Sequence, residues 1–302
     1  DACGNLVVGG VSITHNGGDA TPPTGASTLA DAGPIDACLA NAITATDAAI
    51  PVATEITTLE GDFSDVCGDP VTVTNLTNAV DAGGDNCTWS VTRTYQVADA
   101  CGNIFAAGVS ITHNGGDTTP PTGTSTLADF GPTDACLVDA ITATETARPK
   151  ADEETQLETD FTDACGDPVI ATFVNEAVDA GSTDCNWSVT RNYTVEDGCG
   201  NLVVGGVSIT HTGGDVTGPE PFDVLDDMIN STTSDCNQNV AIPKPAVTDL
   251  CSGPVPTSAP TLTITSDDPG LNIIDAGANW TGLFSVGVTT VTITAEDACG
   301  NT

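Results

Sequence analysis

Hydrophobic and polar residues alternate with a period of two in several segments of this chain. The clearest segment runs from Trp89 to Val97, where every second residue is Trp, Val, Arg, Tyr or Val, and a counterpart runs from Trp187 to Val195. Such alternation is typical of a strand with one buried face. The same reading predicts strands at residues 105–112, 202–210, 261–265 and 288–294. Residues 151–161 begin with acidic residues and predict a short helix, as residues 52–63 do more weakly.

The chain repeats itself. The string Asp-Ala-Cys-Gly-Asn starts at Asp1, Asp99 and Asp297, and a copy with Gly in place of Ala starts at Asp197. The cysteines of the four copies are spaced by 98, 98 and 100 residues. A period of about 100 residues is the size of one β-sandwich domain. Gly-Gly-Asp and a stiff proline-containing link follow each of the first three copies. We expect the last strand of a preceding repeat at 1–19, full repeats at 20–117 and 118–215, and a third repeat without its last strand at 216–302.

Composition narrows the possible functions. The net charge is −37, with five basic residues against 42 acidic ones, which disfavours binding to nucleic acid or to an anionic membrane. Twelve cysteines without a CxxC or HxxxH pair predict disulfides in an oxidising, extracellular compartment rather than zinc sites. The sequence contains no run of 18 apolar residues, so it predicts no membrane-spanning helix. No nucleophile stands in a recognisable catalytic motif, so the chain is not expected to be an enzyme.

The repeated elements resemble a known family. Thr-Pro-Pro-Thr-Gly, Ala-Cys-Leu-Ala-Asn, Asp-x-Cys-Gly, Asn-Cys-Thr-Trp-Ser-Val-Thr and Ala-Asp-Ala-Cys-Gly-Asn are similar to the four-cysteine hyalin-repeat-like domains of giant Bacteroidota surface proteins, including SprB-type gliding adhesins exported by type IX secretion. The resemblance covers residues 20–215, and residues 216–302 resemble the plain hyalin repeat. It implies an all-β fold of tandem immunoglobulin-like antiparallel sandwiches. From the stiff links and the helix patterns described above, we expect these sandwiches to lie end to end as a rod, with one short helix in each of the first two full repeats.

Four cysteines in a full repeat allow three pairings, and sequence alone does not choose among them. In the immunoglobulin-like sandwich that the resemblance implies, the B–C and F–G loops share one pole. This arrangement predicts Cys67–Cys101, Cys165–Cys199 and Cys251–Cys299, and leaves Cys38–Cys87 and Cys136–Cys185. Ser285 stands where the third repeat would have its third cysteine, so Cys236 is expected to be unpaired within the chain, as is Cys3.

Aspartates flank these cysteines and the links between repeats. If the loop pairing holds, they meet at each boundary, and such a group of oxygens suits Ca²⁺, the cofactor we expect here. The alternative is that each aspartate caps its own turn. The candidate ligands are Asp19, Asp65, Asp69 and Asp99, then Asp117, Asp163, Asp167 and Asp197, then Asp215, Asp249 and Asp297.

Several other residues recur at equivalent positions of the repeats, and we interpret them as structural. Arg93 and Arg191 occupy equivalent strand positions and are expected to form a salt bridge inside each repeat rather than to bind a ligand. Trp89 and Trp187 are expected in the core. His15, His113 and His211 are one per repeat and too far apart in sequence to form one metal site.

These observations predict a stalk or spacer of a bacterial cell-surface adhesin or filament, whose partners are neighbouring repeats of the same long chain. One alternative is an adhesin that binds extracellular polysaccharide or surfaces directly. Another is a filament subunit in which residues 5–14 complete the third repeat of a neighbouring chain by strand exchange.

Overall fold

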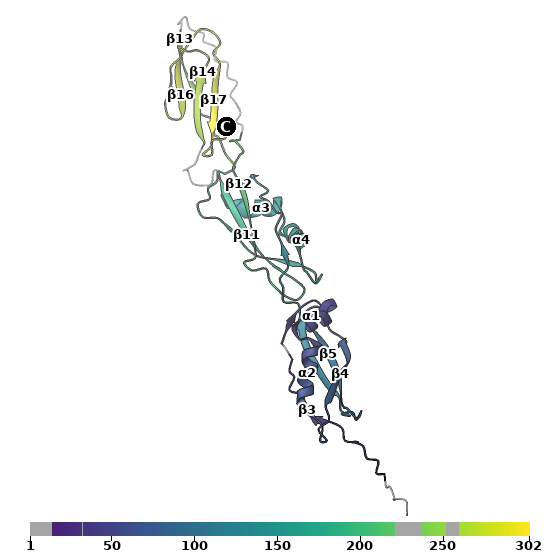
Figure 1. The fold of residues 1–302 in the computed structure, drawn as a ribbon. Helices are drawn as coiled ribbons and strands as arrows, with labels where there is room; N and C mark the ends of the chain where they lie inside the picture. Colours follow the sequence, from purple (N-terminus) through teal and green to yellow (C-terminus); the bar gives the residue numbers. More distant parts are fainter. Residues whose placement is uncertain (1–13, 32, 221–236, 252–259) are drawn as a thin grey trace, which may run out of the picture. The chain divides into compact units, whose positions relative to one another are not determined.

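The first repeat contains a four-stranded sheet. We describe a computed structural model, which covers residues 14–31, 33–220, 237–251 and 260–302 (Figure 1). The strand order is β2 (Ile35–Asp36), β6 (Val109–Gly116), β5 (Trp89–Asp99) and β4 (Val71–Val80). Strands β4, β5 and β6 are antiparallel neighbours, whereas the two-residue strand β2 pairs parallel to β6. The sheet is therefore mixed, not purely antiparallel as expected.

Helices form most of the second layer of this repeat. The 3-10 turn η1 (Leu39–Asn41) leads into α1 (Ala42–Ala49), and α2 (Val52–Asp62) follows. Pro51 separates the two helices, because a residue that precedes proline avoids the helical region, and Ile50 is extended. Helix α1 contacts β4 and β5, and α2 contacts β4. The only other strands described here, β1 (Thr24–Gly25) and β3 (Phe63–Ser64), form a two-residue pair, so the expected second large sheet is replaced by helices.

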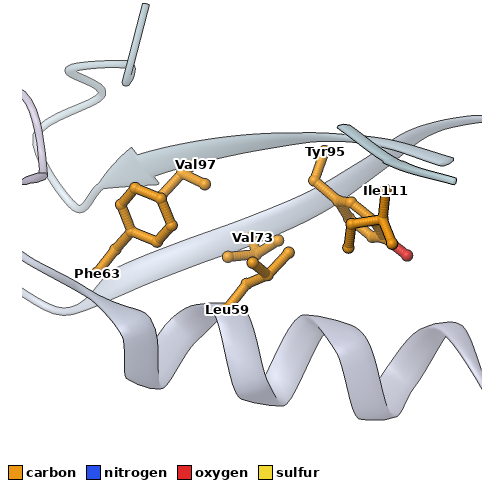
Figure 2. Close-up of a cluster of buried hydrophobic side chains, with 6 residues drawn as sticks. All are labelled: Leu59, Phe63, Val73, Tyr95, Val97 and Ile111. Carbon is orange, nitrogen blue, oxygen red and sulfur yellow. The ribbon is translucent and has the colours of Figure 1, made fainter. Parts of the chain in front are cut away.

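The core lies between helix α2 and the sheet. Leu59 on the helix and Phe63 just after it pack against Val73, Tyr95, Val97 and Ile111 on the strands (Figure 2). Buried and half-buried residues alternate along the whole of β5, as the sequence pattern predicted. Complete burial of one such aliphatic or aromatic side chain contributes about 1.5–3 kcal/mol. A second cluster, with Ala42, Trp89 and Val91, continues the core under α1.

The second repeat uses the same elements in the same order. Its sheet is β8 (Thr133–Asp134), β12 (Val207–Gly214), β11 (Trp187–Glu196) and β10 (Ile170–Val178). The other elements are β7 (Thr122–Gly123), η2 (Leu137–Asp139), α3 (Ala140–Ala147), α4 (Lys150–Asp160) and β9 (Phe161–Thr162). The helix expected at 151–161 is confirmed by α4 and that at 52–63 by α2, whereas α1 and α3 were not predicted.

The described part of the third repeat has strands and no helix. One sheet has the order β13 (Asn237–Pro243), β16 (Asn279–Ser285), β15 (Ile273–Asp275), and a second pairs β14 (Thr261–Ser266) with β17 (Val291–Glu296). The strands expected at 261–265 and 288–294 correspond to β14 and β17. Across the described residues the protein is thus mostly β-sheet with a few helices.

A buried ion cluster lies inside each of the first two repeats. Arg93 is fully buried and its Nη1 lies 2.6 Å from Glu55 Oε2, while Asp47 also contacts the guanidinium. Glu55 accepts a hydrogen bond from Tyr95, and its other oxygen is 2.8 Å from His113 Nε2. The second repeat repeats the arrangement with Arg191, Glu153, Tyr193 and His211, and Glu145 takes the place of Asp47. It adds Glu176, whose carboxylate lies 3.1 Å from Arg191 Nε. The expected intra-repeat salt bridges and the structural role of these two histidines are confirmed, and His15 is exposed.

The chain divides into two compact units whose limits differ from the repeat boundaries. The first unit holds residues 1–122 together with 162–169 and 196–201, and the second holds 123–161, 170–195 and 202–302. Two loops of the second repeat therefore belong to the first unit. The disulfides Cys38–Cys165 and Cys87–Cys199 join these two loops to the first repeat.

Candidate cation and disulfide sites at the repeat boundaries

The disulfides do not close within a repeat. Cys38 bonds to Cys165 and Cys87 to Cys199, both in the first unit, with Cα atoms 5.1 and 5.0 Å apart. In the second unit Cys136 bonds to Cys251 and Cys185 to Cys299. Cysteines 112 to 127 residues apart are thus joined, and the first and third cysteines of one repeat bond to the second and fourth of the next.

All five expected pairs are therefore wrong, namely Cys38–Cys87, Cys67–Cys101, Cys136–Cys185, Cys165–Cys199 and Cys251–Cys299. Cys67 and Cys101 are free, exposed thiols. Cys3 and Cys236, expected to be unpaired, lie outside the described residues.

The grouping of cysteines at a shared end was nevertheless correct. The backbone N–H of Ala37 bonds to Gly116, and that of Asp117 bonds to Asn86, so Cys38 and Cys87 lie at one end of the sheet. Cys67 and Cys101 both lie against the carboxylates around Asp19. The pairing failed because the bonds cross from one end of a repeat to loops that lie one period further along the chain.

Two kinds of turn hold the cysteines of the second and fourth positions. In the Asp65-Val66-Cys67-Gly68 turn, one oxygen of Asp65 accepts the backbone N–H of Cys67 at 2.7 Å, and Gly68 has a φ of 82°. This left-handed conformation explains the glycine after the cysteine. Asp163, Cys165 and Gly166 repeat the turn in the second repeat, with the same 2.7 Å bond.

In the second kind of turn the aspartate is satisfied by an asparagine. Both oxygens of Asp99 accept hydrogen bonds from Asn103, and those of Asp197 and Asp297 accept them from Asn201 and Asn301. Burial works to raise the pKa of Asp99, but the bonds from Asn103 outweigh it and lower the pKa. Asp99 and Asp197 therefore cap their own turns, as the alternative interpretation held.

The other predicted carboxylates meet at each boundary. Ligand atoms of Asp19 lie within 4.8 Å of those of Asp65 and Cys67, and also within 4.8 Å of those of Asp69 and Cys101. Asp117 has the same relation to Asp163 and Cys165, and to Asp167 and Cys199. Asp215, Asp249 and Asp297 form the third group. The structure thus brings together the predicted sets, except that Asp99 and Asp197 stand outside these close groups.

Several of these carboxylates are buried, and some of their oxygens have no hydrogen-bond partner. The unpartnered oxygens belong to Asp19 and Asp65 in the first group and to Asp117 and Asp163 in the second. Burial raises the pKa of Asp117, and the neighbouring carboxylates of Asp163 and Asp197 raise it further. The pKa of Asp215 is raised in the same way, by burial and by Asp249 and Asp297. Such groups are destabilising unless a proton or a cation neutralises them.

Two sets of residues at these sites were not predicted. Asn86 donates its side-chain N–H to the carbonyl of Cys165 and to Asp167, at 3.2 and 3.1 Å. Asn103, Asn201 and Asn301 each donate a second bond to the carbonyl of the aspartate from the preceding link, Asp19, Asp117 or Asp215. The recurring Asn after Cys-Gly was the available signal for the second set.

The Gly-Gly-Asp motif is also explained here. A Cβ on Gly115 would meet the Trp89 ring at 2.2 Å, and one on Gly116 would meet the carbonyl oxygen of Cys87 at 2.0 Å. The two glycines let strand β6 lie against the Trp89 ring and the backbone of Cys87. Asp117, which follows them, then lies beside Asp163 and Asp167 in the second group of carboxylates.

The free thiols stand in a negative environment. The carboxylate of Asp19 raises the pKa of Cys67, and a hydrogen bond to Asp69 raises the pKa of Cys101. Both thiols are therefore protonated at neutral pH.

None of the helices in the described part of the chain has the length and apolar composition of a membrane span.

No protein-family model matches the chain, and no curated protein is significantly similar to it. Solved structures give only distant matches. An endo-fucoidan hydrolase of glycoside hydrolase family 107 shares 15% identity over 78% of this chain and 40% of its own, with a TM-score of 0.18. The protocadherin gamma B4 extracellular domain shares 13% sequence identity, over 75% of this chain and 39% of its own, with a TM-score of 0.23. The human desmocollin-1 ectodomain shares 8% sequence identity, over 75% of this chain and 51% of its own, with a TM-score of 0.20. This chain thus spans less than two thirds of each of these structures, and the scores are too low to assign a shared fold.

Proposed function

We propose that this chain is a spacer region of an extracellular protein, in which each four-cysteine repeat is covalently tied to the next. The observation that carries the proposal is the disulfide pattern, because the four bonds among the described residues all join cysteines more than 100 residues apart and none of these four closes within a repeat. Four disulfides also favour an oxidising compartment. An end-to-end rod of such repeats belongs to this proposal, as does the bacterial cell surface that the family resemblance implies.

Paired disulfides suit a spacer for a mechanical reason. A disulfide that closes a loop of about 100 residues stabilises by roughly 4.7 kcal/mol in the chain-entropy model. More important for a spacer, each bond encloses more than 100 residues in a covalent loop, so that a repeat which opens under tension lengthens the chain only by the residues outside the loop. A disulfide inside a repeat would protect that repeat but would not hold it to its neighbour.

The test is a disulfide map combined with solution scattering. Non-reducing digestion should yield linked peptides for 38–165, 87–199, 136–251 and 185–299, and peptides that join 38 to 87 or 165 to 199 would overturn the linked-repeat proposal. A strand of about ten residues, at ~3.4 Å per residue, makes each repeat roughly 35–40 Å long, and three repeats end to end would form a rod of roughly 110 Å. A much shorter maximum dimension in small-angle scattering would overturn the rod. The same preparation can be tested against polysaccharide, where specific binding would favour the adhesin alternative over the spacer.

A further inference from the structure

The five basic residues of the chain all have partners away from the carboxylate groups. Arg93 and Arg191 belong to the buried ion clusters, Lys150 pairs with Glu145 and Glu176, and Lys244 pairs with Asp275. Arg148 donates to the carbonyl of Ala128 and lies over the Phe130 ring. No Lys or Arg is therefore left to neutralise the aspartates at the boundaries, although the chain carries 42 acidic residues.

The first two carboxylate groups contain buried oxygens with no partner. In the second group Asp117 is 5% exposed and its Oδ2 is unpartnered, while its Oδ1 accepts the backbone N–H of Thr119. Asp163 uses one oxygen for its own turn and leaves the buried Oδ1 unpartnered. In the first group Asp65 is 9% exposed, and its Oδ1 and the Oδ2 of Asp19 are unpartnered. A turn explains one oxygen of each of these aspartates and leaves the other without a role.

We propose that Asp19, Asp65 and Asp69 bind one Ca²⁺ ion, and that Asp117, Asp163 and Asp167 bind another. In each site a ligand atom of the link aspartate, Asp19 or Asp117, lies within 4.8 Å of each of the other two carboxylates. Two of the three aspartates contribute a buried, unpartnered oxygen, and water completes the coordination. Ca²⁺ takes six to eight oxygen ligands in flexible geometry, which suits a partial set of carboxylates, whereas Mg²⁺ demands a near-ideal octahedron.

The sulfur atoms next to these groups indicate oxygen ligation. Cys67 and Cys101 are thiols beside the first group, which by itself would also suit Zn²⁺. At the second group the equivalent Cys165 and Cys199 are both in disulfides, so no thiolate is available there. The donors common to both sites are carboxylate oxygens, the ligands of a hard cation.

Bound calcium would connect segments that the disulfides also connect. Asp117 follows the end of β6, whereas Asp163 and Asp167 flank Cys165, the partner of Cys38. An ion held by these three aspartates links the end of the first sheet to the turn that carries the disulfide, within the first unit. The calcium site therefore reinforces the boundary that the disulfides also reinforce, and it does not require the chain to be a spacer. The calcium count tests the cation site and the disulfide map tests the linked repeats, so either proposal can fail without the other.

The experiment counts ions on the full chain with its disulfides intact. Calcium-free protein is titrated with CaCl₂, MgCl₂ and ZnCl₂ in separate calorimetric experiments, and bound ions are counted by native mass spectrometry. Asp19→Asn and Asp117→Asn should each lower the calcium count by one, and the double variant should lower it by two. Asp152→Asn makes the same charge change at an exposed position of α4 and should leave the count unchanged.

The outcomes are decisive for each site. A variant that leaves the calcium count unchanged overturns the site assigned to its group, and a chain that binds Zn²⁺ but not Ca²⁺ overturns both. Far-UV circular dichroism shows whether a variant has kept its fold. If a variant does not fold, Asp65→Asn or Asp163→Asn replaces it, and the calcium dependence of the melting temperature of the unsubstituted chain provides a second readout, with at least a few degrees of stabilisation expected.

Discussion

Replacing Glu55 by alanine tests the buried ion cluster of the first repeat. Glu55 is 1% exposed and lies between the fully buried Arg93, Tyr95 and His113. One oxygen meets the Arg93 guanidinium at 2.6 Å and the Tyr95 hydroxyl, and the other is 2.8 Å from His113. The substitution removes all three interactions at once and leaves the arginine in the core.

The size of the effect follows from what Arg93 retains. Loss of one partner from a buried ion pair costs about 3–5 kcal/mol, because an uncompensated charge remains buried. Asp47 and the carbonyl of Ile50 still contact the guanidinium, which limits the cost, while the unpartnered Tyr95 hydroxyl adds to it. We expect a loss of about 4 kcal/mol, close to a thousandfold in the opening equilibrium. Glu153→Ala should cost less, about 3 kcal/mol, because Arg191 keeps Glu176 as well as Glu145, whereas Arg93 keeps only Asp47 among its carboxylates.

Hydrogen exchange followed by mass spectrometry resolves the two repeats in one chain. Glu55→Ala should accelerate exchange in β5, residues 89–99, and leave β11, residues 187–196, near its original rate; Glu153→Ala should do the reverse. The disulfides stay intact in all samples. A change below about 1 kcal/mol in β5 would show that the cluster is not stabilised by its charges, and equal acceleration in both strands would show that the repeats open together.

Three further predictions concern acid stability, packing and the free cysteines. Burial acts to raise the pKa of Glu153, but hydrogen bonds from His211, Tyr193 and Arg191 outweigh it and lower the pKa. The stabilising contribution of the ionised Glu153 is therefore present above the ordinary glutamate pKa of about 4.3 and is lost as the pH falls through the lowered pKa of the folded state. Acid unfolding followed by circular dichroism should show this loss, and Glu153→Gln should make the acid limb shallower. Gly115→Ala should destabilise by roughly 1–3 kcal/mol through the Trp89 clash, whereas Gly61→Ala in α2, with open space around it, should stabilise by up to about 1 kcal/mol; urea midpoints that move in the same direction would contradict the packing argument. A chain extended by a second copy of residues 20–98 ahead of Asp1 should bond the Cys38 of the added copy to the original Cys67, and the Cys87 of the added copy to the original Cys101. A Cys67–Cys101 bond in its peptide map would refute the idea that every boundary has the same two disulfides.

Local sequence patterns predicted the strands well and part of the helical layer poorly. Strand β5 was evident because its alternation matches burial on one face, residue by residue. Helix α4 was evident from its acidic first turn and α2 was indicated more weakly. Helix α1 was missed because Ile43, Thr44 and Thr46 are β-branched and favour strands by propensity. Packing of Ala42 against Trp89 overrides that propensity. The second layer was therefore assigned to strands when the structure builds it from helices.

The boundary sites were predicted in composition but not in connectivity. The aspartates that flank the cysteines do meet, because the link and the two turns converge at the same end of the sheet. The disulfide partners could not be deduced, since a repeat contains the same four cysteines whether its bonds close internally or cross to the next repeat. Only the exposed state of Cys67 and Cys101 and the shifted pairs distinguish the two arrangements.

The crossed disulfides set an order for maturation. Cys38 has no correct partner until residue 165 has emerged and its turn has formed, and Cys136 must wait in the same way for residue 251. During that interval Cys38 and Cys87 lie at the same end of a folded repeat, where an oxidant could join them incorrectly. Oxidation of Cys38 must then lag behind the appearance of its repeat by about one repeat length, or an isomerase must undo the premature bond. Repeats of this kind would mature as a sequence of events along the chain, each step completed by the arrival of the next segment.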